Sequence, residues 1–278
     1  MKKITRRSFL AAAGLTAAAL ALTACGGSAS STASSTASSA ASSEAASTSA
    51  AAELTTVEAG KLTMATNAAF PPYEMTTDAG DFEGIDIETA QAIADKLGLE
   101  LQIDDMDFDA ALLSVQQGKA DIVMAGVTVT DERKAVMDFS DSYATGIQSI
   151  IVPEGSDIAS PDDLAGKKIG TQRGTTGYIY CSDDFGDENV VAYDDGLTAV
   201  QALNNGQVDA VVIDNAPAKE FIAANPGLVI LETSYAEEDY AIGLAKGSSL
   251  EDAINSALEE LKADGTLQSI VDKYISAE

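Results

Sequence analysis

A short segment occurs twice in this chain. Residues 117–123 (Gln-Gly-Lys-Ala-Asp-Ile-Val) return in similar form as residues 205–211 (Asn-Gly-Gln-Val-Asp-Ala-Val), so that Gly118 and Gly206 lie 88 residues apart. In each copy a glycine that suits the left-handed end of a helix precedes an apolar run typical of a strand covered on both faces. The repeat therefore predicts two similar α/β units within one chain.

The residues around the two copies alternate between strand and helix patterns. In the first unit the periodicity predicts a strand at 62–66, a helix at 86–97 with Asp86 as its N-cap, a strand at 99–103 and a helix at 109–117. In the second unit it predicts strands at 148–152, 168–170 and 228–231, a helix that begins at Ser160-Pro161, and a helix at 197–205. A strand at 240–244 and helices at 250–264 and 267–275 close the chain. This alternation predicts an α/β fold with mainly parallel sheets.

The charge of the chain limits its partners. Its 16 Lys and Arg residues against 44 Asp and Glu residues give a net charge of −28. Such a surface repels nucleic acid and anionic membranes, so we expect no nucleic-acid partner. The chain has no His, which is the commonest general base and metal ligand. We therefore predict no metal site and no cofactor.

The N-terminal residues have the composition of an export signal. Lys2, Lys3, Arg6 and Arg7 precede an apolar stretch over residues 9–24 that is short for a membrane span. Leu-Thr-Ala-Cys at residues 22–25 resembles the lipobox of bacterial lipoproteins, which implies that residues 1–24 are a lipoprotein signal peptide and that Cys25 is diacylated. The paired arginines are also similar to a twin-arginine signal, and both this route and general secretion remain open.

The segment after Cys25 is predicted to be a tether. Residues 25–57 consist largely of Ala, Ser and Thr and contain too few large apolar residues for a core. A soluble domain is therefore expected to contact the membrane through its lipid anchor only. Cys181 has no predicted disulfide partner once Cys25 is acylated, and we interpret it as a buried apolar residue.

Unlike residues follow the two copies of the repeat. Ligands of open parallel sheets bind outside the carboxyl ends of the strands. The 88-residue offset places Gly126 opposite Asp214, and Arg133 follows Gly126 by seven residues. A guanidinium holds a carboxylate in bidentate fashion, and a carboxylate accepts hydrogen bonds from an ammonium group. Opposed across a cleft, Arg133 and Asp214 would hold the two ends of a zwitterion.

Two further features favour a small ligand. Residues 170–177 (Gly-Thr-Gln-Arg-Gly-Thr-Thr-Gly) follow a predicted strand and open a predicted helix, where backbone N–H groups bind anions. The P-loop ending Gly-Lys-Ser/Thr is absent from this segment, so we favour a carboxylate over a phosphate. Phe70, Tyr73 and Phe108 lie in turns after strands and are candidates to contact the aliphatic stem of the ligand.

Several segments resemble the extracytoplasmic solute-binding proteins of polar amino-acid ABC importers, bacterial solute-binding protein family 3. They are residues 65–74 (Ala-Thr-Asn-Ala-Ala-Phe-Pro-Pro-Tyr-Glu), 84–88, 125–133, 138–140 (Asp-Phe-Ser), 174–176 (Gly-Thr-Thr) and 214–215 (Asp-Asn), all in the family's order. The resemblance implies the type II periplasmic-binding fold, with two α/β lobes of mixed, mainly parallel sheets and a two-strand hinge. The first lobe would comprise residues 58–144 plus 242–278, and the second residues 145–241.

The same resemblance implies a role for individual residues. Arg133, Thr128 and Thr176 match the positions that hold the ligand carboxylate, and Asp214 with the carbonyl of Gly126 matches those that hold its amino group. The side chain and stem of the ligand would contact Asn67, Phe70, Tyr73, Phe108 and Gln172. Many relatives that bind glutamine or cationic amino acids have Asp where this chain has Asn67, which favours a neutral polar ligand without excluding cations. Glu74 is interpreted as a structural residue.

The resemblance also implies how the protein works and with which partners. It predicts a monomer that captures a free polar amino acid and delivers it to an ABC permease, with no catalytic residues. Two alternatives stay open. A lyase or dehydratase on the same scaffold would need an acid/base group in the cleft, and no nucleophile–base pair is visible. A membrane-tethered sensor would have the same binding domain, and the sequence contains no output domain.

Overall fold

The computed structural model of the chain describes residues 54–275. The predicted signal peptide, the lipidated Cys25 and residues 26–53 of the predicted tether lie outside the described residues. Among the helices at residues 54–275, none has the length and apolar character required to span a membrane.

The first sheet has five strands in the order β5-β1-β6-β14-β7. Its strands are β1 (Lys61–Thr66), β5 (Glu100–Asp105), β6 (Ile122–Val123), β7 (Met137–Phe139) and β14 (Gly243–Ala245). β1 runs parallel to β5 and β6, whereas β14 runs antiparallel to β6 and β7. A small antiparallel sheet of β2 (Ala69–Phe70), β3 (Glu74–Thr76) and β4 (Phe82–Glu83) follows β1 along the chain.

Helices cover both faces of the first sheet. The alternation of side chains along β1 sends Leu62 and Met64 into one apolar cluster and Ala65 into another. The first cluster contains residues of α1 (Ile85–Leu97), α7 (Glu251–Ala263) and α8 (Thr266–Tyr274), and the second contains residues of α2 (Phe108–Gln116). Burial of these apolar side chains is the main source of stability in such a layer structure.

The second sheet is built in a similar way. Its order is β10-β9-β11-β8-β12, and β13 also pairs with β8. The strands are β8 (Ala144–Pro153), β9 (Ile169–Gln172), β10 (Val190–Tyr193), β11 (Ala210–Asp214), β12 (Leu228–Ile230) and β13 (Ala236–Tyr240). β9 runs parallel to β10 and β11, and β8 runs antiparallel to β11, β12 and β13. The covering helices are α4 (Thr176–Phe185), α5 (Gly196–Asn204) and α6 (Asn215–Ala224).

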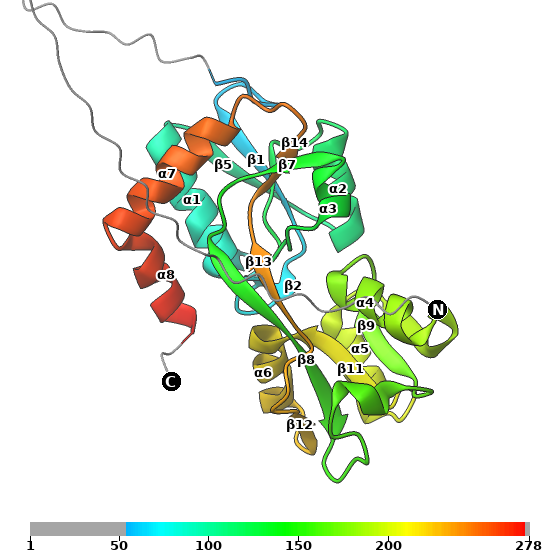
Figure 1. Ribbon diagram of the computed structural model, residues 1–278. Helices are drawn as coiled ribbons and strands as arrows, with labels where there is room; N and C mark the ends of the chain where they lie inside the picture. Colours follow the sequence, from blue (N-terminus) through cyan, green and yellow to red (C-terminus); the bar gives the residue numbers. More distant parts are fainter. Residues whose placement is uncertain (1–53, 276–278) are drawn as a thin grey trace, which may run out of the picture. The chain divides into compact units, whose positions relative to one another are not determined.

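Two antiparallel strands connect the sheets. The chain leaves the first sheet after β7, enters the second along β8, and returns along β13 to β14. β8 and β13 pair from Ala144 opposite Tyr240 to Gln148 opposite Ala236, and they run side by side in Figure 1. The single strand expected at residues 240–244 is therefore wrong. It is two strands, because the chain passes from one sheet to the other at Ala241-Ile242.

The two copies of the repeat that predicted two units share several features in the structure. Gly118 and Gly206 share a φ of 66°, which is the left-handed region that glycine adopts most easily. Asp121 accepts from the backbone N–H of Thr63 within β1, and Asp209 accepts from that of Lys168 just before β9. Each aspartate thus joins the end of a helix to the neighbouring parallel strand.

Two other local predictions differ from the structure. Asp86 does not cap α1, whose N-cap is Gly84. Asp86 is buried inside the first turn because it accepts hydrogen bonds from the backbone of Gly126 and from Tyr143. The helix expected from Ser160-Pro161 is a single 3₁₀ turn over Pro161–Leu164, although it has the expected N-terminal capping box with Asp163. Cys181 is fully buried, as predicted, and burial raises the pKa of its thiol to about 12.

Candidate functional site

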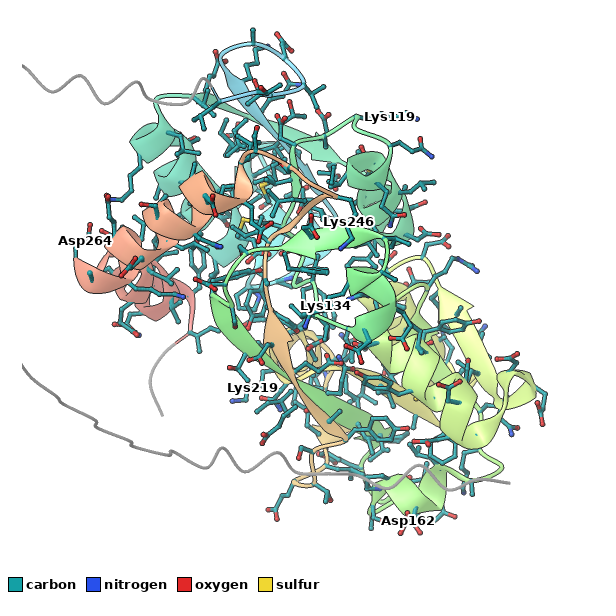
Figure 2. The ribbon with its side chains drawn as sticks, turned by 45° about the horizontal axis from the view of Figure 1, so that its top comes forward. Lys119, Lys134, Asp162, Lys219, Lys246 and Asp264 are labelled. Carbon is teal, nitrogen blue, oxygen red and sulfur yellow. The ribbon has the colours of Figure 1, made fainter. Side chains whose placement is uncertain are left out.

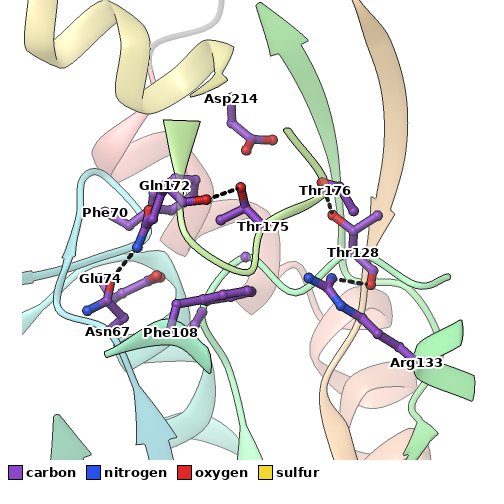
Figure 3. A pocket seen from close by; sticks show the side chains of 12 residues that line it. Asn67, Phe70, Glu74, Phe108, Thr128, Arg133, Gln172, Thr175, Thr176 and Asp214 are labelled. Carbon is purple, nitrogen blue, oxygen red and sulfur yellow. Dashed lines mark hydrogen bonds between the residues drawn. The ribbon is translucent and has the colours of Figure 1, made fainter. Parts of the chain in front are cut away.

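A pocket with about 310 Å³ of space between its atoms, part of it open to solvent, lies where strands of both sheets end. In the first sheet, its walls come from residues that follow β1, β5 and β6. In the second sheet, they come from the last residues of β9 and β11 and from residues that follow β9. They are Asn67, Phe70, Glu74, Phe108, Ala125, Gly126, Thr128, Arg133, Gln172, Thr175, Thr176 and Asp214. Figure 3 shows these side chains from close by. The location at the carboxyl ends of strands is the one expected for a ligand site in α/β proteins.

Arg133 is the buried cation of this cavity. It lies in the short helix α3 (Asp131–Lys134), whose first turn is capped by the Thr130 side chain. Its guanidinium donates to the carbonyl of Thr128 at 2.7 Å and to that of Gly174 at 3.2 Å, and it lies 5.4 Å from the centre of the Phe108 ring. No carboxylate of residues 54–275 lies in salt-bridge range of it. Burial lowers the pKa of Arg133, while the charge of Glu238 acts in the opposite direction.

The neighbouring cation on α3 behaves differently. Lys134 is exposed, whereas Arg133 is 8% exposed. Figure 2 labels Lys134 among the side chains drawn on the ribbon. Buried cations without an anionic partner are unfavourable unless a ligand supplies the anion. The burial of Arg133 therefore indicates an anionic group in the cavity.

Asp214 provides the opposite charge. It is the last residue of β11, 8% exposed, and it accepts hydrogen bonds from the Tyr240 hydroxyl and, at 2.8 Å, from the Gln148 side-chain amide. Burial raises the pKa of Asp214 to about 7, although these two donors favour the charged form. A ligand ammonium would stabilise the ionised carboxylate.

Backbone donors lie beside Arg133. Thr175 caps α4 by accepting from the N–H of Tyr178, and Thr176 is the first residue of this helix. Within the described part of the chain, the N–H groups of Thr128 and Thr176 have no hydrogen-bond acceptor. Both hydroxyls already donate to Glu238 Oε2 at 3.0 Å. The N–H groups, rather than the hydroxyls, are therefore the free donors for an anion, and the N-terminus of α4 adds a favourable dipole.

Two amide side chains meet across the cavity. Gln172, at the end of β9, donates to Asn67 Oδ1 at 2.8 Å, and Asn67 donates to the carbonyl of Met106 at 2.9 Å. The bond from Arg133 to Gly174 also joins residues that flank different sheets. The two lobes are thus in contact across the cavity. The rings of Phe70 and Phe108 supply its apolar surface.

Glu74 is the most unusual group in the wall. It is fully buried, and as an ionised carboxylate it has no hydrogen-bond donor among the described residues. Burial, the nearby charge of Asp86 and a hydrogen bond with the Asp86 side chain raise the pKa of Glu74 well above its ordinary value. A protonated Glu74 can donate to the Asp86 carboxylate, and a cationic ligand would favour its ionised form.

The structure brings nearly all of the predicted side chains together. Of the predicted site residues that it describes, nine line the cavity: Asn67, Phe70, Gly126, Thr128, Arg133, Phe108, Gln172, Thr176 and Asp214. Tyr73 does not. Its ring stacks behind Phe70 at 5.9 Å and meets the edge of Tyr240 at 5.3 Å, so it supports the wall from outside. Cys25, the predicted lipidation site, lies outside the described residues.

Other residues of the site were missed. Thr175 lines the cavity, while Gln148, Glu238 and Tyr240 come from the strands that connect the sheets and contact residues of the cavity wall. One sequence signal for Glu238 and Tyr240 was available, which is the alternation of side chains along a strand. The two residues are two positions apart and buried, whereas Glu237 and Asp239 are exposed. That alternation requires the strand limits to be known first.

Comparisons with known proteins agree on one family. The family model described as bacterial extracellular solute-binding proteins, family 3, matches residues 62–277. The L-cystine-binding protein TcyJ of Escherichia coli K12 is 33% identical over 226 residues, covering 80% of this chain and 85% of the relative.

Solved structures give the same result. The arginine-, lysine-, histidine-binding protein ArtJ of Geobacillus stearothermophilus is 34% identical, with a TM-score of 0.75 over 78% of this chain and 96% of the other. An ancestral arginine-binding protein, solved bound to arginine, is 42% identical, with a TM-score of 0.74 over 78% of this chain and 99% of the other.

Proposed function

The chain belongs to family 3 of the bacterial extracellular solute-binding proteins, and on this basis we propose that it captures a free amino acid in its cavity and delivers it to an ABC permease. Its fold is the type II periplasmic-binding fold, as the sequence predicted. The relatives are binding proteins of transporters and not enzymes, which removes the lyase alternative.

The head group of an amino acid fits the two charged walls. The carboxylate would accept from the Arg133 guanidinium and from the N–H groups of Thr128 and Thr176, which have no other acceptor within residues 54–275. The ammonium would donate to Asp214 and to the carbonyl of Gly126. The observation that carries this proposal is that a buried cation and a buried carboxylate face one cavity without an ion pair between them. A zwitterion neutralises both in one step.

For the side chain, the structure favours a cation over the neutral ligand that Asn67 suggested. Glu74 and Asp214 line the cavity and Asp86 and Glu238 contact its wall, whereas Arg133 is the one buried cation among residues 54–275. A guanidinium has a planar set of donors and stacks on aromatic rings such as those of Phe70 and Phe108. We therefore propose arginine as the ligand that fits best, in agreement with the ligands named for two of the similar proteins.

We propose that the protein acts at the outer face of the cell membrane. Family members are extracellular, and the lipobox-like residues 22–25 support an anchor at Cys25 on the outer face of the cell membrane. A separation into detergent and aqueous phases tests this anchor. We expect the native protein in the detergent phase and the Cys25→Ser protein in the aqueous phase. Recovery of both proteins in the aqueous phase would contradict it.

A comparison of arginine with citrulline tests the ligand proposal. Citrulline has the same length and head group but a neutral urea in place of the guanidinium. In calorimetric titrations we expect arginine to bind at least about tenfold more tightly, because a guanidinium would draw Glu74 into its ionised form and pair with it, whereas a neutral urea would not. Equal affinities would contradict the cationic side-chain site. Absence of binding by any amino acid of a panel would contradict the function itself.

A further inference from the structure

Glu238 occupies a central position that neither the family comparison nor the sequence assigns. It lies on β13, one of the two strands that connect the sheets, and it is 6% exposed. Its Oε2 atom accepts from Thr128 Oγ1 at 3.0 Å, from Thr176 Oγ1 at 3.0 Å and from Gln148 Nε2 at 3.1 Å. A single oxygen thus receives three donors from three separate segments.

These donors come from both lobes. Thr128 follows β6 of the first sheet, Thr176 begins a helix that covers the second, and Gln148 lies on the connecting strand β8. The two threonine hydroxyls are 3.4 Å apart. Glu238 can accept from both only while the lobes are together, so this three-way contact is specific to the closed cavity.

The same threonines present free N–H groups to the cavity. Their side chains are held by Glu238, which leaves each backbone with little freedom to turn away. Gln148 extends the contact further, because its amide nitrogen donates both to Glu238 and to Asp214. The connecting strands therefore contact the groups at both ends of the proposed head-group site.

We propose that Glu238 is a positioning residue: by accepting from the hydroxyls of Thr128 and Thr176 together, it sets the spacing of their N–H groups for the ligand carboxylate when the lobes close. This inference rests on the proposed amino-acid function. The change in ligand affinity on removal of Glu238 tells two effects apart by its sign, because the Glu238 carboxylate would also repel the carboxylate of the ligand. Removal of Glu238 strengthens binding if its charge alone acts, and weakens binding if it positions the threonines.

Variants of Glu238 separate these effects. Glu238→Ala removes the acceptor and is expected to weaken arginine binding about tenfold or more, since hydrogen bonds to charged groups are among the stronger ones. Glu238→Gln keeps an acceptor oxygen and is expected to recover most of the affinity. Glu237→Ala is the matched control, because it removes the same charge from the exposed side of the same strand.

A protein without the two threonine hydroxyls tests whether Glu238 acts through Thr128 and Thr176. Thr128→Val with Thr176→Val removes both hydroxyls and keeps both N–H groups. We expect Glu238→Ala to have no further effect in that background, whereas a general structural role would add its full loss. Titration calorimetry gives the affinities, and circular dichroism confirms that each variant is folded. If Glu238→Ala does not fold, Glu238→Met, which fills similar space without an acceptor oxygen, gives the same comparison in both backgrounds.

The outcomes are distinct from those of the proposed function. If the wild-type protein binds arginine and the Glu238→Ala protein binds it equally well or more tightly, the positioning role of Glu238 is wrong and the proposed function stands. The positioning role is also wrong if Glu238→Ala lowers the affinity as much in the protein with Thr128→Val and Thr176→Val as it does in the wild type. Wild type that binds no amino acid overturns the proposed function.

Discussion

Arg133 and Asp214 face the same cavity from different lobes and form no ion pair with each other. Each is instead held by neutral groups: carbonyls of Thr128 and Gly174 for the guanidinium, Tyr240 and Gln148 for the carboxylate. These neutral partners fix the position of each charge without neutralising it. The site is thus prepared for a ligand that has both charges.

Replacement of Arg133 should abolish tight binding. Arg133→Met keeps much of the stem that packs near Phe108 and removes the guanidinium, so the ligand carboxylate loses its cation. We expect a loss of about 100-fold or more in affinity, measured by titration calorimetry. Lys134→Met, which removes an exposed cation from the same helix, should change affinity by less than about twofold. Similar losses in both variants would show that general charge, not the site, is responsible.

Binding should release a proton from Asp214. In the ligand-free protein burial raises the pKa of this carboxyl to about 7, so it is partly protonated near neutrality. The ligand ammonium favours the ionised form, which lowers this pKa and expels the proton. Affinity should therefore rise as the pH increases from about 5.5 to 7.5. Titrations at pH 6.5 in buffers of different ionisation enthalpy measure the release, and Asp214→Asn should remove this contribution.

The same carboxyl should affect stability in the ligand-free state. Its folded pKa lies above its ordinary value of 3.8, so its contribution to stability is present at low pH and is lost as the pH rises through about 7. Urea unfolding of wild type and Asp214→Asn between pH 5 and 8 measures this. The wild type should lose more stability over that interval than the variant. Parallel pH profiles would contradict the assignment.

Gly126 should not tolerate a side chain. Its φ is 55°, and an added Cβ would lie 2.9 Å from Phe70 Cε1 and 3.3 Å from the Tyr240 ring. We expect Gly126→Ala to lower the free energy of unfolding by about 2 kcal/mol and to weaken ligand binding. Gly118→Ala is the control, because it has a similar φ of 66° but open space around its Cβ. It should lose only about 1 kcal/mol of stability and bind normally. Urea unfolding and calorimetry make the comparison.

The repeated aspartates should act on stability alone. Asp121 accepts from the N–H of Val57 and of Thr63, and Asp209 accepts from that of Lys168. Asp121→Ala leaves two backbone donors without this acceptor and is expected to lower the free energy of unfolding by about 2 kcal/mol, with a smaller effect for Asp209→Ala. Neither should change the affinity for the ligand. An Asp121→Ala protein as stable as the exposed-site control Asp252→Ala would contradict this role.

Much of the fold was predictable because local signals agreed with it. Gly118 and Gly206 end helices in the left-handed conformation, and the 88-residue offset between the copies correctly placed Gly126 opposite Asp214, both in the cavity wall. Arg133 stands out because cations are scarce in this acidic chain. The limits of the strands that connect the sheets were not predictable, since residues 240–244 have a continuous apolar pattern and the change of sheet depends on tertiary packing.

The acidic residues of the site show the limit of sequence reasoning more clearly. With 44 Asp and Glu residues in the chain, no local pattern distinguishes Glu238 from exposed Glu237 beside it. Glu238 is recognisable once β13 is paired with β8, because only then is its side of the strand known. Glu74 was interpreted as structural, and the lack of hydrogen-bond donors to its carboxylate becomes evident only when its surroundings are assembled. Tyr73 was expected at the ligand because the sequence pattern places it in a turn after a strand, as it does Phe70, but its ring stacks on Phe70 and does not line the cavity.

The most direct test of the central claim is one calorimetric comparison of two ligands on two proteins. The ligands are the amino acid that binds most tightly in a panel and the same molecule without its α-amino group, and the proteins are wild type and Asp214→Asn. If Arg133 and Asp214 hold opposite ends of one amino acid, wild type prefers the complete amino acid by about 100-fold or more, and Asp214→Asn loses most of that preference. Equal binding of both ligands by wild type, or a preference that persists in Asp214→Asn, would contradict the account.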